Sequence, residues 1–339
     1  MRASLLSLLS VCVWAGWASV AGAQILDPNG APNLDPRCIN PTFVGVGDVG
    51  GDACQKVIDV YDYMNGQLGT LVAGGNATLG QVGSLGGFGT FSIGIRANAM
   101  STSIPNLEQT GIGVGPPGSP ALISTSNRFI AVPTADAAFG LFKGFPAGVT
   151  HIGGVDLLLG ATALPHFTQH AVQVTTPDHW YSFGVGSRVG LLEESLLTPG
   201  VSITYFRRDL PHTRIVATAG PTRSLTVEDY HLTTTAWRLV VGKSFLLLSA
   251  AAGIGRDKYD GSATLTYNVD GNTPSEPFVL DATPTRTNAF LDLALNLAVL
   301  KIAGEIGRVW SGGVTTYNTF DQASDAPRWY GSLGLRIGR

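Results

Sequence analysis

Residues 91–100 read FSIGIRANAM, a stretch in which larger apolar side chains alternate with small or polar ones. Phe91, Ile93 and Ile95 fall in one series, and Arg96 falls in the other. A period of two is the mark of a β-strand whose two faces meet different surroundings. This stretch therefore predicts a strand with one apolar face and one polar face.

The same alternation recurs along the rest of the chain. It appears in six further segments, at 155–163, 181–191, 201–205, 237–241, 289–299 and 329–337. The stretch around 289–300 also fits an amphipathic helix, because Asp292 and Asn296 are four residues apart. We interpret it as a strand because its neighbours are strands, and we expect an all-β fold.

The connections between these segments alternate in length. Long links cover 101–127, 165–179, 258–284 and 311–328, and short ones lie near 143–148, 193–200, 242–244 and 300–301. The length of the link near Pro221 is left open. Outer-membrane barrels have short periplasmic turns and long external loops. We therefore predict a transmembrane antiparallel up-and-down β-barrel of about 10–14 strands over residues 87–339. Ten strands are well marked, and a hairpin through Ala263, Leu265 and Tyr267 would make twelve.

Composition supports a membrane barrel. Charged residues make up 13% of the chain, against about 25% in an average soluble domain. No segment after the first 23 residues offers about 18 consecutive uncharged apolar residues, the length of a membrane-spanning helix. Backbone groups in lipid must then be satisfied by a closed barrel. The net charge of -3 gives no support to a nucleic-acid partner.

The N-terminus predicts export. Arg2 precedes an uncharged run from Leu5 to Val20, and residues 21–23 (AGA) form a cleavage site. This pattern indicates a signal peptide over 1–23 rather than a retained helix. An exported chain favours a disulfide between Cys38 and Cys54, because two cysteines without a nearby histidine are too few ligands for zinc.

Residues 24–86 differ from the rest. Residues 54–63 predict a short helix with Asp52 as its cap, and a glycine-rich stretch follows at 66–87. The segment is interpreted as a periplasmic appendage or as a plug that enters the barrel.

The last strand carries a family resemblance. Trp329, Leu333, Leu335 and Ile337 alternate as they do at the C-terminus of bacterial outer-membrane β-barrels, although Arg339 replaces the usual final aromatic residue. The sequence resembles this broad group over residues 1–23 and about 87–339.

The resemblance implies the cell outer membrane of a Gram-negative-type bacterium, with outer-membrane lipid and the barrel-assembly machinery as partners. The helix-bearing N-terminal segment also resembles that of hydrophobic-solute transporters of the long-chain fatty acid type. That second resemblance implies a plug inside a fourteen-strand barrel.

The polar faces of the strands should point into the lumen. Such side chains either line an aqueous path or form a charge-paired filling, and both interpretations stay open. The lumen-lining candidates are Arg96, Asp156, Arg188, Arg238, Asp292, Asn296, Glu305 and Arg336.

We expect a passive channel or transporter for small or hydrophobic solutes. The alternatives are a structural or adhesive barrel that works through its external loops, and an outer-membrane hydrolase. The last would use loop histidines such as His166 and His170, near Asp178 and His179. We assign no catalytic residue, no metal and no cofactor, and we do not expect an enzyme, since no serine lies in a G-x-S-x-G setting.

Overall fold

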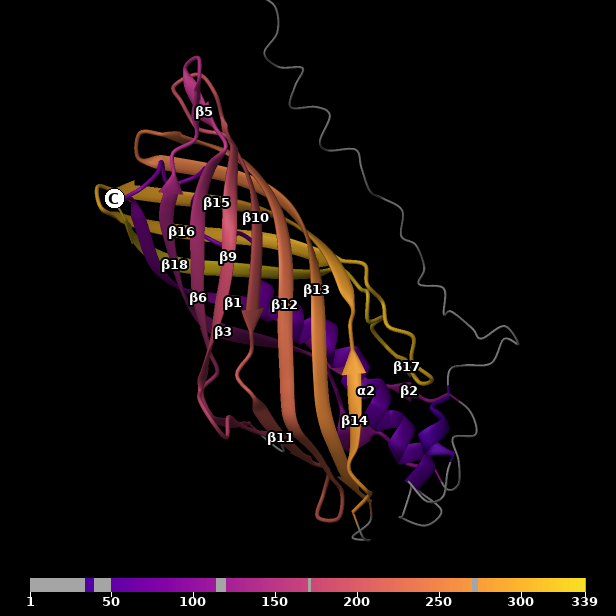
Figure 1. Cartoon of the computed structure of the whole chain (residues 1–339). Coiled ribbons are helices and arrows are strands. Elements are labelled where there is room, and N and C mark those ends of the chain that lie inside the picture. Colours follow the sequence, from indigo (N-terminus) through magenta and orange to yellow (C-terminus); the bar gives the residue numbers. More distant parts are fainter. Residues whose placement is uncertain (1–33, 40–49, 114–119, 170–171, 270–273, 339) are drawn as a thin grey trace, which may run out of the picture.

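The computed structural model describes residues 34–39, 50–113, 120–169, 172–269 and 274–338 (Figure 1). The predicted signal peptide, 1–23, lies outside these ranges. Ten strands close an antiparallel barrel in chain order, which confirms the predicted fold. They are β1 (Phe91–Pro105), β3 (Thr125–Phe142), β6 (Gly154–Ala163), β9 (Tyr181–Leu192), β10 (Gly200–Asp209), β12 (Ser224–Phe245), β13 (Leu248–Asn268), β15 (Thr285–Leu297), β16 (Leu300–Trp310) and β18 (Arg328–Gly338).

The ring closes between its first and last strands. β1 pairs with β18 from Ser92↔Gly338 to Met100↔Tyr330. The closed ring pairs the backbone of every barrel strand on both sides, which leaves no open edge. The segment near 289–300 forms β15 and the start of β16, so the strand interpretation holds there.

The alternation decides which side chains face outward. On β1, Ile93 and Ile95 are exposed on the outer face, whereas Ser92 and Arg96 are buried on the inner face. β15 repeats this arrangement, with Leu291 exposed outside. The barrel therefore has an apolar outer wall and a polar inner wall.

Short turns gather at one end, and two of them were placed wrongly from the sequence. The β12–β13 turn lies at Leu246–Leu247 rather than 242–244, because Lys243 and Ser244 remain in the strand ladder. The β15–β16 turn lies at Ala298–Val299 rather than 300–301. Glycine and polar residues are the usual signals of a turn, whereas here Leu246 and Ala298 adopt the left-handed conformation, with φ of 50° and 53°.

A third short link is longer than predicted. It extends from Lys143 to Gly153 and contains a hairpin of β4 (Phe145–Ala147) and β5 (Thr150–Ile152). This hairpin and the chain's C-terminal strand end lie at the same end of the barrel, far from β11 and β14 (Figure 1).

The opposite end carries the long links and an extension of the wall. β12 and β13 continue past the ring, where β13 pairs with β14 (Phe278–Ala282), as in the hairpin predicted there. β12 pairs with β11 (Thr213–Thr218), followed by β8 (Val172–Thr175) and β7 (Phe167–Gln169). A short parallel pair joins β2 (Leu122–Ile123) to β17 (Thr319–Phe320). We call the sheet of β7, β8, β11 and β14, with the ends of β12 and β13, the external platform.

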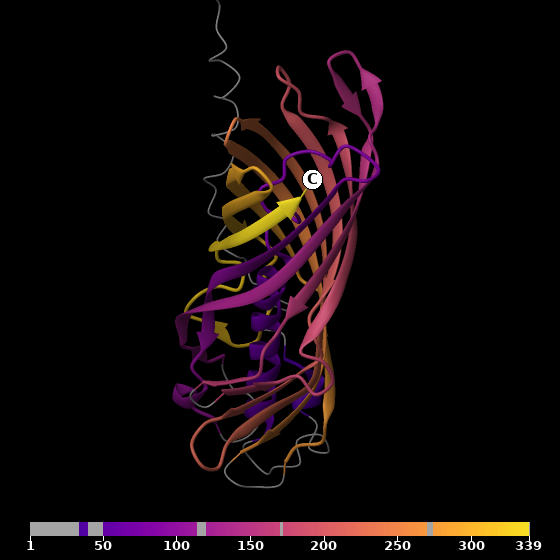
Figure 2. The same ribbon diagram turned by 90° about the vertical axis from the view of Figure 1, so that its left-hand side faces the viewer.

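Helix α2 (Gly50–Ala73) lies inside this wall (Figure 2). A 3-10 turn, η1 (Pro36–Cys38), precedes α2 in sequence, and a second one, η3 (Leu107–Gln109), follows β1. Within the described residues, neither α2 nor any shorter helix carries an apolar stretch long enough to cross a membrane.

The helix is much longer than the predicted 54–63, and Asp52 lies in its first turn rather than before it. The glycine-rich stretch predicted to follow the helix begins inside it, although glycine disfavours helical backbone. Here glycines allow close packing on β13. A Cβ on Gly69 would overlap the Tyr259 ring, and a Cβ on Gly261 would overlap the Asn65 side chain.

Candidate functional site

The barrel interior is occupied by residues 50–85, which we call the inner segment. It consists of α2 and the irregular chain that follows it. Gly74 ends the helix with a φ of 62°, a conformation that suits glycine at this position. From there the chain crosses the lumen on the short-turn side and reaches β1.

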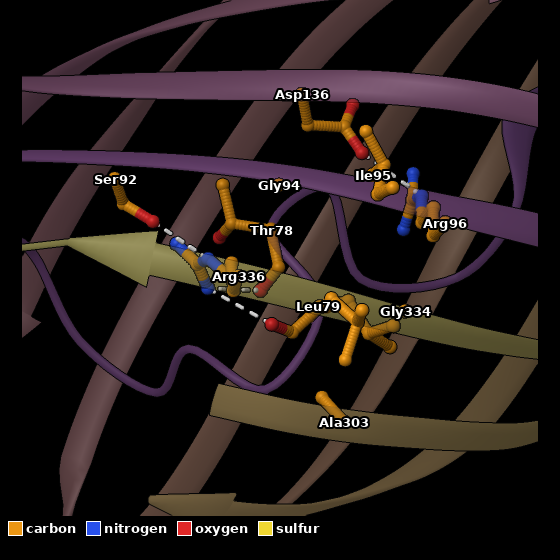
Figure 3. Close-up of a pocket in the computed structure, with 11 residues that line it drawn as sticks. Thr78, Leu79, Ser92, Gly94, Ile95, Arg96, Asp136, Ala303, Gly334 and Arg336 are labelled. Atoms are coloured by element: carbon orange, nitrogen blue, oxygen red, sulfur yellow. Dashed lines mark hydrogen bonds and ion pairs between the residues drawn. The ribbon is translucent and has the colours of Figure 1, made fainter. Parts of the chain in front are cut away.

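Arginines from five strands hold the backbone just after the helix. Four of them donate to backbone oxygens and the fifth to a threonine hydroxyl, so the inner segment is fixed mainly through its main chain (Figure 3 shows the contacts of Arg336). The bonds are Arg208 Nη1 to Ala73 O (2.8 Å), Arg238 Nη2 to Gly74 O (2.6 Å) and Nε to Gly75 O (2.9 Å), Arg96 Nη1 to Asn76 O (2.5 Å), Arg336 Nη1 to Leu79 O (2.9 Å), and Arg188 Nη1 to Thr78 Oγ1 (2.5 Å).

Carboxylates of the wall accept from the same stretch. Glu305 accepts from the amides of Gly75 (3.1 Å) and Asn76 (2.6 Å). Asp292 accepts from the Asn76 side chain at 2.6 Å. The amide of Leu85 donates to Asp156 at 3.1 Å. Backbone carbonyl oxygens and backbone N–H groups of this irregular chain thus both find hydrogen-bond partners inside the barrel, as buried backbone requires.

The arginines are also paired with acids of the wall. Arg188 lies 2.7 Å from Asp156, and Arg238 pairs with Asp257. Asp136 takes two partners, Arg96 at 2.9 Å and Arg208 at 2.7 Å. These side chains are almost fully buried, and buried charges are tolerated when paired and hydrogen-bonded. Arg336 has no acidic partner within ion-pair distance among the described residues, and it bonds to carbonyls and Ser92 instead.

Seven of the eight residues proposed from the sequence meet around the inner segment. Asn296 differs, because its amide donates to Ser249 at 2.8 Å within the wall. Sequence reasoning missed Asp136, Arg208 and Asp257. The sequence carried a signal for them, because each falls in the inward series of an alternating strand, as Arg208 does beside the outward Arg207.

An apolar pocket of about 80 Å³ lies at the other end of the interior. It is formed between the N-terminal half of α2, the link after β1 and the external platform. Its apolar lining includes Ala53, Val57, Val60, Ile112, Leu225 and Val269. Most pocket-lining surface in ligand sites is of this apolar kind, with a few polar groups at the rim.

The predicted disulfide between Cys38 and Cys54 is confirmed, and it joins η1 to the first turns of α2. Both sulfurs are buried in the same apolar cluster as Ile58, Leu232 and Leu265. The disulfide therefore fixes the start of the inner segment at the external platform.

Two carboxyls on α2 have perturbed acidities at this end. Burial, followed by repulsion from Asp59 and Asp35, raises the pKa of Asp62 to about 7. Burial also raises the pKa of Asp59, although the Asn318 and Gln55 side chains donate to its carboxylate.

The loop histidines considered for a hydrolase lie in separate surroundings where the structure describes them. His166 Nε2 bonds Thr176 Oγ1 at 2.6 Å, His179 packs against Tyr181, and His170 lies outside the described residues. In the parts of the chain that the structure describes, no three His, Cys, Asp or Glu side chains are placed to hold a metal ion.

A different pair of histidines meets on the external platform. His212 Nδ1 lies 2.5 Å from Asp229 Oδ1, and its ring is 4.7 Å from that of His231. His231 in turn lies 3.2 Å from the Thr233 hydroxyl.

A closed antiparallel barrel with an apolar outer wall is the architecture of bacterial outer-membrane proteins. The chain is located in the cell outer membrane. No protein-family model matches the sequence, and no curated protein sequence matches it. The solved structures it is similar to include the translocator domain of the autotransporter NalP from Neisseria meningitidis, with a TM-score of 0.40 and 9% identity over 74% of this chain and 86% of that one.

Two further similar structures are an enzyme and a transporter. The outer membrane protease OmpT from Escherichia coli has a TM-score of 0.36 and 9% identity, over 74% of this chain and 97% of that one. The P. putida toluene transporter TodX has a TM-score of 0.28 and 11% identity, over 80% of this chain and 93% of that one.

Proposed function

We propose that this barrel binds small hydrophobic solutes at its external end and passes them along the inner segment, which acts as a plug. The observation that carries this proposal is the apolar pocket between α2 and the external platform. A solute bound there touches the plug directly through Val57 and Val60. Binding energy gained in the pocket is therefore available to shift the plug's position.

The two faces of the barrel wall support the rest of the proposal, which concerns membrane contact and plugging. Residues 87–339 contact outer-membrane lipid through their apolar outer face and are inserted by the barrel-assembly machinery. The lumen-facing charges hold the plug rather than line an open aqueous path, since their bonds go to residues 73–85. Opening requires these arginines to exchange carbonyl partners for water.

Pocket binding is tested with N-phenylnaphthylamine, a small apolar fluorophore, added to detergent-solubilised protein. We expect saturable binding that Val57→Asp weakens about tenfold, because a charge would have to be desolvated in the pocket. Leu122→Asp is the matched control, since Leu122 is exposed at the same end but outside the pocket. Equal binding by wild type and Val57→Asp would overturn the pocket.

Plugging is tested by conductance in planar bilayers. Wild type should show rare, brief openings, and Arg208→Ala should show more of them because the bond to Ala73 O is lost. Steady porin-like conductance by the wild type would contradict a plug.

Membrane placement is tested separately by fractionation and electrophoresis with and without boiling. An outer-membrane band that migrates differently when unboiled is expected. A soluble band without a shift would reject the whole proposal.

A second candidate function is a structural or adhesive barrel that works through its external loops. The external platform favours it, because β12 and β13 run 22 and 21 residues, well beyond the ring. If adhesion is the function, variants of the platform surface should lower surface attachment while fluorophore binding and conductance stay unchanged.

A further inference from the structure

The short-turn end of the barrel carries exposed apolar side chains at its tips. Leu246 is 100% exposed and Leu196 is 93% exposed. Other tips are also apolar, namely Phe145, Leu197, Leu247 and Val299. Exposed apolar surface of this extent marks contact with another apolar phase or partner.

Local turn geometry does not account for these residues. Leu246 and Ala298 adopt positive φ, a conformation that Asn or Gly adopts more easily in two-residue hairpins. The tips are continuous with the apolar outer wall, because Leu248 and Leu297 in the flanking strands are exposed on it. The apolar outer surface of the barrel thus continues over the tips of the β12–β13 and β15–β16 turns.

A polar cavity of about 370 Å³ opens at the same end, inside the ring of turns. Residues 80–86 of the chain form one side of it, and Gly86 there has open space around the position of a Cβ. Lys143, His151 and Lys301 also line it.

Two lysines and two glutamates line this cavity, and a third lysine, Lys243, lies beside it. Three of the five lysines in the chain lie at this end, at positions 143, 243 and 301. Lys243 donates to the carbonyl oxygens of the β9–β10 turn, including Thr198 O at 3.0 Å, and lies 3.9 Å from the Glu194 carboxylate. The side-chain amines of Lys143 and Lys301 make no direct hydrogen bond or ion pair with another described residue, and the Glu194 carboxylate attracts Lys301 only at longer range. Lys301 lies opposite Arg336 on the neighbouring strand, on the inner face.

The two acidic residues of the cavity are engaged elsewhere. Glu193 accepts from the hydroxyl and amide of Ser84. Glu194 accepts from the Ser244 amide at 2.6 Å and from its hydroxyl at 3.0 Å. These bonds turn the two carboxylates toward Ser84 and the β12 strand end, so the amines of Lys143 and Lys301 are the groups in the cavity that can pair directly with an external anion.

The charged residues that line the cavity are close in sequence to the apolar residues at the tips of the turns. Lys143 follows Phe142, Lys301 comes two residues after Val299, and Glu194 comes two residues before Leu196. Each of these turns therefore presents a polar group to the mouth and an apolar group beyond it. A molecule that satisfies both surfaces has an anionic head and an acyl chain.

The geometry points to a phospholipid-binding site at the short-turn rim. The phosphate of an inner-leaflet lipid occupies the cavity beside Lys143 and Lys301, and its acyl chains lie against Leu246 and Leu247. This inference rests on the proposed contact with membrane lipid, but not on the solute pocket at the other end.

The test measures binding of fluorescent phosphatidylglycerol to the full chain in detergent. Diacylglycerol with the same acyl chains serves as a probe without phosphate, and inorganic phosphate as a competitor without chains. We expect saturable binding of phosphatidylglycerol, at least tenfold weaker binding of diacylglycerol, and competition by phosphate only at far higher concentration. Lys143→Gln combined with Lys301→Gln should weaken phosphatidylglycerol binding at least tenfold, whereas Lys258→Gln, at the external end, should not.

Leu246→Ser combined with Leu247→Ser tests the apolar half and should weaken the same binding several-fold. Unchanged binding by the double lysine variant, or equal binding of diacylglycerol, would overturn the site. Inorganic phosphate binding as tightly as the lipid would make it a free-phosphate site and overturn the lipid assignment. Each variant must retain the shift between boiled and unboiled bands, and loss of that shift in the wild type would instead reject the membrane placement.

Discussion

The two halves of the inner segment are held by different physical means. The external half packs like the core of a soluble protein, with Ile58, Leu232 and Leu265 buried around the disulfide. The other half, residues 74–85, makes smaller apolar contacts, such as that of Leu79 with Ala294 and Ala303, and is held in addition by polar bonds to charged groups of the wall.

The difference suggests which half is able to move. A buried leucine contributes about 1.5–3 kcal/mol wherever it stays out of water, whereas a hydrogen bond to a charged group contributes a similar amount only in one geometry. Water can replace a carbonyl as the partner of an arginine, but nothing in water replaces apolar packing. The external half is therefore the anchor, and residues 74–85 are the part that exchanges partners when the lumen opens.

The largest effect on the free energy of unfolding is expected from replacing Arg238, which holds residues 74–85. Arg238→Gln removes the bonds to Gly74 O and Gly75 O and leaves Asp257 buried without its cation. Removing one partner of a buried pair costs about 3–5 kcal/mol. The free energy of unfolding in urea, followed by the unboiled band, measures it. Arg207→Gln is the control, because Arg207 is exposed on the outer face. A loss no larger than that of the control would show that the polar half is not fixed by this pair.

The next effect concerns the anchor of the external half. Replacing Cys38 and Cys54 by serine should cost about 3 kcal/mol in the chain-entropy model, confined to η1 and the start of α2. Trypsin cleavage after Arg37 reports it, because Arg37 in the intact protein bonds Val279 O at 2.8 Å. The unboiled band should persist, since the ring itself is untouched. Unchanged cleavage would mean that apolar packing alone holds this end.

The same contrast explains what the sequence predicts well. Alternation depends only on which phase each face of a strand meets, so Arg96, Arg188 and Arg336 could be assigned to one face without knowing their partners. Arg96 and Arg336 bond to backbone carbonyls of residues 76–79, and Arg188 bonds to the Thr78 hydroxyl. No local pattern encodes such contacts, because any sequence offers carbonyls.

Turns and the helix were predicted less well, because tertiary contacts overrode local preference. The left-handed Leu246 lies where a glycine or asparagine would be expected. Gly66 and Gly69 lie within a helix that they disfavour by intrinsic propensity. Only the position of Tyr259 on the opposite wall explains the second of these glycines.

Gly66 and Gly69 lie near the end of α2, where the two halves of the inner segment meet, and they offer a matched pair of substitutions. Gly69→Ala places a methyl group on the Tyr259 ring and should destabilise the packed helix by about 2 kcal/mol. Gly66→Ala meets only ordinary contact, 3.8 Å from Pro284 Cγ, and should be neutral or stabilise the helix by up to about 1 kcal/mol. Hydrogen exchange of the α2 amides distinguishes the two. Equal protection in both variants would show that helix and wall are not tightly packed at Tyr259.

The smallest effect is a dependence on pH that belongs to the external half alone. Burial, with Asp59 and Asp35 nearby and Arg37 opposing them, raises the pKa of Asp62 to about 7, above the ordinary 3.8. The folded state therefore favours the protonated carboxyl, so this contribution is present at low pH and is lost as pH rises through 7. Between pH 6 and pH 8 we expect a loss of about 1 kcal/mol at the external half.

Asp62→Asn should remove that dependence, because an amide does not ionise, while Asp260→Asn, at a half-exposed surface pair with Lys258, should leave it intact. Hydrogen exchange of α2 at the two pH values, corrected for the intrinsic exchange rate, measures it. Greater protection of wild-type α2 at pH 8 than at pH 6 would reverse the predicted sign. The arginines that bond to residues 74–85 stay charged throughout this range, so their bonds should not contribute to the pH dependence that is measured at the external half.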